Sequence, residues 1–295
     1  MRPRWLVLGA GGMLGQDLVA ALRTDHTVAV TGATRADVDI RDAMAVDAAV
    51  AASDLVINAA AWTAVDDAEA DPDQALAVNG DAVGSLAAAC ARRDTTLLHV
   101  STDYVFAGDA TRPYPEDAPT GPLNAYGHSK LAGERHVLRS LPQHGYVVRT
   151  SWLYGAHGRN FVRTMLDLAA LRPTVDVVDD QRGQPTWSGA LARRLVELGH
   201  RALAGAAPAG VYHGTASGET TWYGLARAVY ELTGLDPDRV RPTTSEAFPR
   251  PARRPGYSVL DHGRWALAGL PPMDDWRAML VDALAAMTGR RSMRA

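Results

Sequence analysis

A glycine-rich turn near the N-terminus constrains the fold of this chain more than any other feature. A short apolar run at residues 5–8 leads into Gly9-Ala10-Gly11-Gly12-Met13-Leu14-Gly15, and a helical pattern begins there. A strand that ends in such a turn and enters a helix offers backbone N–H groups and the helix dipole to a pyrophosphate. The spacing of Gly9, Gly12 and Gly15 differs by one residue from the common dinucleotide fingerprint. We interpret this segment as a dinucleotide-binding turn.

The first half of the chain alternates short apolar runs with longer helical patterns. We expect strands at residues 5–8, 27–31, 54–58, 96–100 and 146–150, and helices at 13–23, 42–52, 74–92 and 124–141. Alternation of this kind indicates βαβ units, and continuous apolar strands are typical of a parallel sheet covered on both faces. The sequence therefore predicts an α/β fold, a Rossmann-type doubly wound parallel sheet.

The pattern loosens after residue 150. It predicts helices at residues 161–171, 190–203, 222–233 and 274–287 and strands at 175–178 and 211–213. Residues 241–255 are rich in proline and arginine and cannot form a regular helix. We expect this half to supply a smaller C-terminal lobe.

Composition excludes several classes of function. The net charge of −3 leaves no strong basic field for a nucleic acid or an anionic membrane. The first apolar stretch is too short for a membrane span or a secretion signal, and the single Cys90 permits no internal disulfide. The nine histidines have no metal-ligand spacing, so we expect no metal site. These features are typical of a cytoplasmic enzyme.

Tyr126 and Lys130 are the pair most indicative of chemistry. They stand four residues apart in a predicted helix, so their side chains share one face. Lys130 is the only lysine among 30 lysines and arginines, and an ammonium and a guanidinium are not interchangeable. When a hydride is added to a carbonyl, the oxygen needs a proton. A tyrosine can supply it if an ammonium lowers its pKa.

Two further segments contain candidate functional residues. Ser101 and Thr102 follow the fourth predicted strand, where ligands bind in open α/β sheets, and either hydroxyl could polarise a substrate carbonyl. The acidic residue that usually ends the second strand is missing, and Arg35 follows instead. An arginine there can accept a 2′-phosphate, which favours NADPH over NADH.

These segments resemble the extended short-chain dehydrogenases, and more specifically the dTDP-4-dehydrorhamnose reductase family. The similarity rests on the glycine turn, residues 58–61, 101–106, 122–126 and 130–134, and on residues 149–155, 160–162, 179–181, 185–186, 218–222 and 251–255. It extends over nearly the whole chain. The family reduces the 4-keto group of a dTDP-linked 4-keto-6-deoxy sugar, with dTDP-L-rhamnose as its product.

The resemblance implies roles for individual residues. Thr102, Tyr126 and Lys130 would be catalytic, and Thr102, Tyr126, Asp103 and Trp152 would contact the sugar nucleotide. Together with the residues argued above, the cofactor site would comprise Gly9, Gly12, Met13, Leu14, Arg35, Asp39, Ile40, Ala61, Trp62, Thr63, Val100, Tyr126 and Lys130. We expect residues 1–150 with 177–226 to bind the dinucleotide and residues 151–176 with 227–295 to bind the sugar nucleotide.

The sequence departs from the family at three positions. Trp62 stands where a smaller ring is usual, and Asp17 and Gly189 stand where some relatives place glutamates that bind Mg²⁺ at a dimer interface. We therefore expect a monomer or a weak homodimer without that metal.

Three alternatives stay open at this point. The substrate could be a related keto sugar, such as the precursor of dTDP-dihydrostreptose in an antibiotic pathway. The chain could be a sugar-nucleotide epimerase, or an NADP-binding regulatory subunit of the methionine adenosyltransferase type. A dehydratase is disfavoured, because it would carry an acidic pair where this chain has Asp103 and Tyr104.

Overall fold

The computed structural model describes residues 1–288, and a six-stranded parallel sheet forms its centre. The strand order is β10-β5-β4-β3-β1-β2. The strands are β1 (Arg4–Leu8), β2 (Ala29–Ala33), β3 (Leu55–Asn58), β4 (Thr96–Thr102), β5 (Gly145–Thr150) and β10 (Gly210–His213). Because β2 lies on one side of β1 and β3 on the other, the direction of winding reverses at β1, where such sheets bind ligands. The predicted fold class is confirmed.

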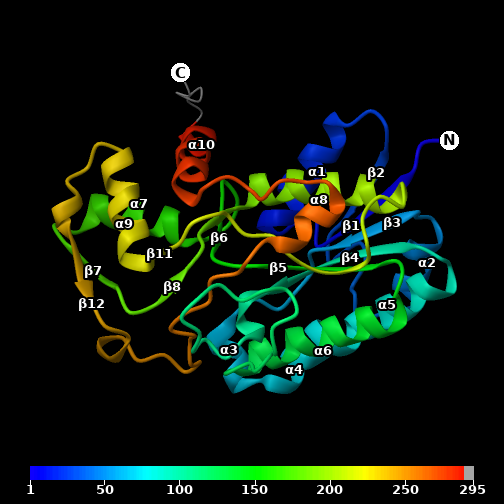
Figure 1. Ribbon diagram of the computed structural model, residues 1–295, viewed down its shortest axis with the longest axis horizontal. Coiled ribbons are helices and arrows are strands. Elements are labelled where there is room, and N and C mark those ends of the chain that lie inside the picture. The colour runs from blue at the N-terminus through cyan, green and yellow to red at the C-terminus, as the bar shows by residue number, and fades with distance from the viewer. Residues whose placement is uncertain (289–295) are drawn as a thin grey trace.

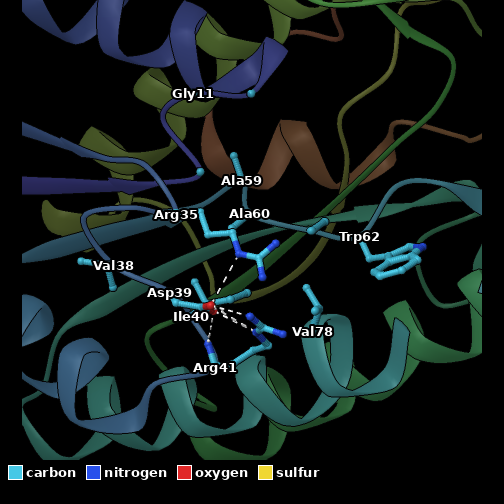
Figure 2. Close-up of a pocket in the computed structure, with 13 residues that line it drawn as sticks. Gly11, Arg35, Val38, Asp39, Ile40, Arg41, Ala59, Ala60, Trp62 and Val78 are labelled. Atoms are coloured by element: carbon cyan, nitrogen blue, oxygen red, sulfur yellow. Dashed lines mark hydrogen bonds and ion pairs between the residues drawn. The ribbon is translucent and has the colours of Figure 1, made fainter. Parts of the chain in front are cut away.

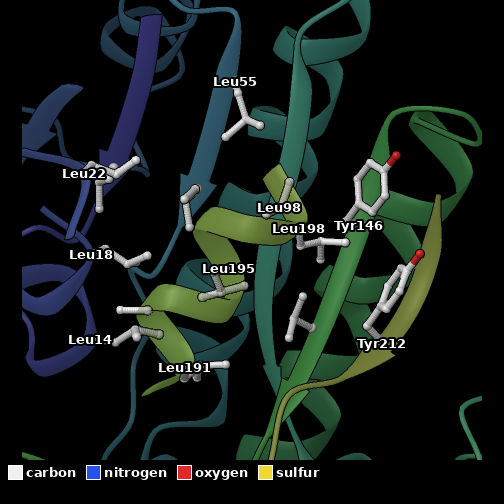
Figure 3. Close-up of a cluster of buried hydrophobic side chains, with 14 of the residues drawn as sticks. Leu14, Leu18, Leu22, Leu55, Leu98, Tyr146, Leu191, Leu195, Leu198 and Tyr212 are labelled. Atoms are coloured by element: carbon white, nitrogen blue, oxygen red, sulfur yellow. The ribbon is translucent and has the colours of Figure 1, made fainter. Parts of the chain in front are cut away.

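Helices cover both faces of the sheet (Figure 1). One face carries α1 (Met13–Thr24) and α8 (Ser188–Leu203), and the other carries α2 (Ala43–Ala51), α5 (Ala82–Arg92) and α6 (Ala125–Ser140). Alternate strand residues supply the two cores: Trp5 and Val7 pack under α1 and α8, whereas Leu6 and Leu8 pack under α2 and α5. Figure 3 shows the leucines of α1 and α8 facing Leu55, Leu98, Tyr146 and Tyr212 of the sheet. This two-sided burial explains the uninterrupted apolar runs of the strands.

A smaller lobe lies at one end of the sheet (Figure 1) and has its own core. It contains α7 (Phe161–Leu171), α9 (Trp222–Leu232), α10 (Trp276–Thr288) and the parallel strands β7 (Val175–Val178) and β12 (Val240–Thr243). Two short strand pairs connect it to the sheet, β6 (Leu153–Tyr154) with β9 (Thr186–Trp187) and β8 (Arg182–Gly183) with β11 (Thr220–Thr221). Within residues 1–288, none of the helices is both long and apolar enough to cross a membrane.

Two sequence expectations were wrong in detail. The second strand begins at Ala29 instead of Thr27, because Asp25 accepts hydrogen bonds from the Thr27 backbone and hydroxyl and holds that residue in the preceding turn. The single helix expected at residues 74–92 is two helices, α4 (Pro72–Leu76) and α5, joined by a π-helical turn at Ala77–Asp81. The side chain of Asn79 in that turn bonds to the backbone of Trp62.

Candidate active site

A cavity of about 320 Å³ opens at the carboxyl ends of β1 and β3, where the winding reverses. Its walls are the glycine turn, the loop after β2, the segment after β3 and Val78 of the π-helical turn (Figure 2). The expected cofactor residues that line it are Gly9, Gly12, Arg35, Asp39, Ile40, Ala61 and Trp62. The structure therefore brings together residues from four separate segments of the sequence.

The glycine turn fits the diphosphate of a dinucleotide. Gly9 has a φ of 77°, and a Cβ atom there would lie 2.6 Å from the Ala60 nitrogen. A Cβ atom on Gly15 would lie 2.1 Å from the Gly9 carbonyl oxygen, so α1 can start this close to the turn only with glycine. Gly12 caps α1 without a side-chain hydrogen bond, which leaves the first N–H groups of the helix for an anion.

Besides Tyr126 and Lys130, which are described below, four expected cofactor residues do not line this cavity. Leu14 is buried in the core between α1 and the sheet, and Met13 begins α1 beside it. Thr63 is exposed in the loop after Trp62. Val100 is part of β4, and its carbonyl oxygen accepts a hydrogen bond from Lys130. Their roles in cofactor binding stay predictions.

Thr102 and Tyr126 meet at the end of β4, where the hydroxyl groups of the two side chains interact. Burial raises the pKa of Tyr126 to about 12, although the bond to Thr102 lowers it. Asn124 caps α6 by accepting from the Gly127 N–H and thereby places Tyr126 in the first turn of the helix. Tyr126 is therefore a protonated phenol at neutral pH.

The structure separates the two candidate hydroxyls of β4. Ser101 donates a hydrogen bond of 2.6 Å to Glu134, which forms a buried ion pair of 2.7 Å with Arg149. Thr102 lies on the other side of the strand, where it faces Tyr126 and Asp103. Because neighbouring residues of a strand point to opposite faces, only Thr102 can share a substrate with Tyr126.

Lys130 is fully buried at the next turn of α6. Its Nζ donates 2.7 Å to the Val100 carbonyl oxygen and lies 3.3 Å from Nε2 of His99. Burial lowers the pKa of Lys130 to about 8. The expected lowering of the Tyr126 pKa by this ammonium is absent, because the ammonium group is turned towards β4 and burial dominates at the phenol.

Asp103 is a buried carboxyl group beside the two hydroxyls. Its Oδ1 accepts from Thr102 at 3.1 Å, and its Oδ2 has no hydrogen-bond partner among the described residues. Burial raises the pKa of Asp103 to about 7, although Ser258 and Thr102 hydroxyls nearby lower it. Asp103 thus faces the same space as Thr102 and can accept or donate a hydrogen bond there.

A second cavity, of about 410 Å³, lies in the smaller lobe. Its walls include Asp66, Phe161, Trp222, Phe248, Arg250 and Arg254. Trp152 stacks on Trp222 with ring centroids 3.7 Å apart, and its backbone adopts a φ of 46°. Arg254 donates hydrogen bonds to Asp66 and interacts with Tyr104, whose ring contacts that of Tyr126. Side-chain contacts through Tyr104 therefore link the wall of this cavity to Tyr126.

Sequence reasoning missed several residues of these sites. Asn58 and Asn79 hold the segment after β3, since Asn58 accepts from the Ala60 N–H and Asn79 exchanges hydrogen bonds with Trp62. His99 lies beside Lys130, and Arg41 lines the first cavity. In the sequence, Arg250 and Arg254 stand out only as part of a proline-rich run. Polar residues inside buried segments, such as Asn58, were the available signal.

No group of three or more His, Cys, Asp and Glu side chains within residues 1–288 is placed to hold a metal ion. Asp17 accepts 2.5 Å from the Ser188 hydroxyl and lies 3.7 Å from His157.

Comparison with known proteins matches residues 3–288 to the family described as the RmlD substrate binding domain. The chain belongs to this family. A relative from Streptomyces griseus named dTDP-4-dehydrorhamnose reductase is 56% identical, with 98% of this chain and 95% of the relative covered. Another from Streptomyces niveus, named dTDP-4-keto-6-deoxy-D-glucose reductase, is 49% identical over 99% of this chain and 100% of its own length.

A crystal structure of a family member has the same fold. The Bacillus anthracis dTDP-4-dehydrorhamnose reductase in complex with NADP superposes with a TM-score of 0.89 at 33% identity. The superposition covers 96% of this chain and 99% of the other. Membership of the family, expected from the motifs, is confirmed.

Proposed function

We propose that this chain is an NADPH-dependent reductase of the 4-keto group of a dTDP-linked 4-keto-6-deoxy sugar, of the dTDP-4-dehydrorhamnose reductase type. One observation carries the proposal: a protonated, half-buried Tyr126 beside Thr102 lies at the sheet edge that also forms a dinucleotide cavity. The names of the relatives from Streptomyces griseus and Streptomyces niveus and the NADP complex of the Bacillus anthracis protein support it. NADH is the second candidate cofactor.

The residues act on the carbonyl oxygen of the substrate. Bound NADPH supplies the hydride to C4. Tyr126 gives its proton to the oxygen as negative charge develops there, and its raised pKa keeps it protonated until then. Thr102 donates or relays a hydrogen bond to the same oxygen and orients the carbonyl. Asp103 contacts the sugar beside Thr102.

Lys130 stabilises the negative charge that passes from the carbonyl oxygen to Tyr126. As an ammonium in a buried site, it exerts a stronger electrostatic effect than it would in water. We also assign it a hydrogen bond to the cofactor ribose, as the family resemblance implies. Arginine would be a poorer substitute, because a compact ammonium can contact both the ribose and the phenol, whereas the guanidinium is larger and planar.

The second cavity supplies the site for the nucleotide part of the substrate. Its aromatic side chains, Phe161, Trp222 and Phe248, offer flat apolar surfaces to a pyrimidine ring. Arg250 and Arg254 offer cations to a diphosphate. Trp152 extends this aromatic surface by stacking on Trp222.

The positions of the two cavities suggest which parts of the chain bind which ligand. We propose that residues 1–150 with 177–226 bind the dinucleotide and residues 151–176 with 227–295 bind the sugar nucleotide; residues 289–295 lie outside the described residues. We further propose that the enzyme acts in the cytoplasm, because its single cysteine is buried and no described feature needs an oxidising compartment. A monomer or weak homodimer is our expected state.

The first experiment is oxidation of NADPH and NADH with enzymatically generated dTDP-4-keto-6-deoxyglucose, with and without a 3,5-epimerase. Oxidation that requires the epimerase and disappears in Tyr126→Phe supports the rhamnose-type reductase. Oxidation without the epimerase assigns a different 4-keto sugar, such as a substrate of antibiotic biosynthesis. Tight cofactor binding without oxidation contradicts the proposal and favours a regulatory binding protein, while turnover without net cofactor oxidation favours an epimerase.

A further inference from the structure

The loop after β2 forms one end of the first cavity. There, one carboxylate lies between two guanidinium groups. Asp39 receives hydrogen bonds of 3.0 Å from Nε and 2.6 Å from Nη2 of Arg41. Arg35 approaches the same carboxylate at 3.5 Å. All three residues line the cavity, and Figure 2 shows both guanidinium groups converging on Asp39. Three charged side chains therefore share the wall opposite the glycine turn.

The local backbone fixes where Arg41 projects. Its N–H donates 3.0 Å to Asp39 Oδ1, which closes a tight turn. The next residue, Asp42, caps α2 by accepting from the N–H groups of Met44 and Ala45. Arg41 is thus held between a turn and a capped helix, and its position does not depend on a ligand.

The charge balance of this wall is positive. Two guanidinium groups face one carboxylate, whose pKa is lowered mainly by its hydrogen bond to Arg41, so it is ionised at neutral pH. The strand β2 ends in Gly32 and Ala33 and leads to Thr34, so no acidic side chain is placed there for a ribose hydroxyl. The nearest acid, Asp37, is engaged by the N–H and hydroxyl of Thr34 at 2.9 and 2.7 Å.

Both guanidinium groups keep donors for a further anion. The Arg41 side chain uses Nε and one Nη2 hydrogen on Asp39, and a guanidinium has five N–H donors. The side chains of Arg35 and Arg41 are 77% and 39% exposed. Ion pairs at this exposure are weak because water screens them, so Asp39 orients the arginines without saturating them.

We infer that Arg41 acts with Arg35 as the site for the 2′-phosphate of the dinucleotide and that Arg41 determines the preference for NADPH over NADH. Arg35 follows β2, where a 2′-phosphate is usually recognised, and Arg41 approaches from the start of α2. Two guanidinium groups directed at one phosphate from different segments supply positive charge and a defined hydrogen-bond geometry. The inference depends on the proposed function only in placing a dinucleotide in this cavity.

Calorimetric titration with 2′,5′-ADP and 5′-AMP tests this without any sugar substrate. The two probes share the adenosine and differ chiefly at the 2′-position. We expect Arg41→Gln to raise the dissociation constant of 2′,5′-ADP by about tenfold, which corresponds to the loss of one charge-assisted hydrogen bond. The dissociation constant of 5′-AMP should stay within about twofold. Arg41→Lys, which keeps the charge but loses the fork, is expected to lie between these limits.

The matched control is Arg92→Gln, which removes an exposed arginine paired with Asp47 away from the cavity. It should change neither titration. The ratio of the dissociation constants for NADPH and NADH, followed by protein fluorescence, should shift towards NADH by the same factor in Arg41→Gln. Thermal unfolding checks that each variant is folded.

Equal weakening of both probes in Arg41→Gln would overturn the inference, because Arg41 would then hold the part that they share. Unchanged binding of both would overturn it too, because Arg41 would then serve only Asp39. Neither result bears on the reductase proposal, which fails instead if the wild-type protein binds NADPH but does not oxidise it with the keto sugar.

Discussion

Nζ of Lys130 lies 3.3 Å from Nε2 of His99, and the two side chains are buried together between α6 and β4. Asn58 determines which ring nitrogen of His99 carries the proton. Its Oδ1 accepts from the Ala60 N–H, so its amide nitrogen must donate to Nδ1 of the ring, at 3.1 Å. The pKa of His99 is well below its ordinary value because of burial, so the ring is neutral and Nε2 bears the hydrogen. A ring N–H therefore faces the lysine.

This arrangement predicts a pH effect in His99→Gln. The reaction needs a charged Lys130, whose pKa is about 8, so kcat/KM of the wild type should fall as pH rises through about 8. A glutamine can present a carbonyl oxygen to the ammonium instead of an N–H, and we expect the alkaline limb to move up by about one pH unit. The control is His128→Gln on the exposed side of α6. An alkaline limb that stays in place in His99→Gln would disprove the coupling.

Tyr126→Phe should separate cofactor binding from chemistry. The variant removes the proton donor and keeps the ring that packs against Tyr104. General acid catalysis is worth roughly 10²–10⁴-fold, so we expect kcat to fall at least about 100-fold. The dissociation constant for NADPH should stay within about twofold. A rate loss that is explained by weaker binding alone would show that Tyr126 is not the acid.

Ser101→Ala and Thr102→Val should have opposite consequences although the residues are adjacent. Thr102→Val keeps the shape of the side chain and removes the hydroxyl beside Tyr126, so kcat should fall about tenfold with little loss of stability. Ser101→Ala removes a donor to the buried Glu134 and should cost about 1–3 kcal/mol of unfolding free energy, with kcat nearly unchanged. Steady-state kinetics and urea unfolding of both variants measure this. If Ser101→Ala is the slower enzyme, the assignment of the two hydroxyls must be reversed.

Asp103→Asn should change how stability depends on pH. Burial raises the pKa of Asp103 from 3.8 to about 7, so between these values the unfolded chain loses this proton while the native protein keeps it. The native state is therefore favoured below about pH 4, and that advantage is lost as pH rises to about 7. Relative to Asp103→Asn, which does not titrate, the wild type should lose up to about 4 kcal/mol over this range. Urea unfolding at several pH values measures this. If the unfolding free energies of the wild type and Asp103→Asn differ by the same amount at every pH, the pKa of Asp103 is not raised.

The residues that act through local spacing could be read from the sequence. Tyr126 and Lys130 share a helix face because they are four residues apart, and the glycine turn needs only its neighbours to form. The alternation of apolar segments determined the parallel sheet, since strands covered on both faces leave a recognisable pattern. The single lysine also indicated a special role, because every other basic residue among the lysines and arginines of this chain is an arginine.

The tertiary structure decided which of these residues work together. It directed Ser101 into the Glu134–Arg149 pair and Thr102 towards Tyr126, and it placed Arg41 beside Arg35. It turned Lys130 towards His99 and Val100, where burial opposes the lowering of the Tyr126 pKa that spacing alone suggested. The physical reason is the same in each case. Hydrogen-bond partners and desolvation depend on residues distant in the chain, whereas turns and helix faces depend on the residues next to them.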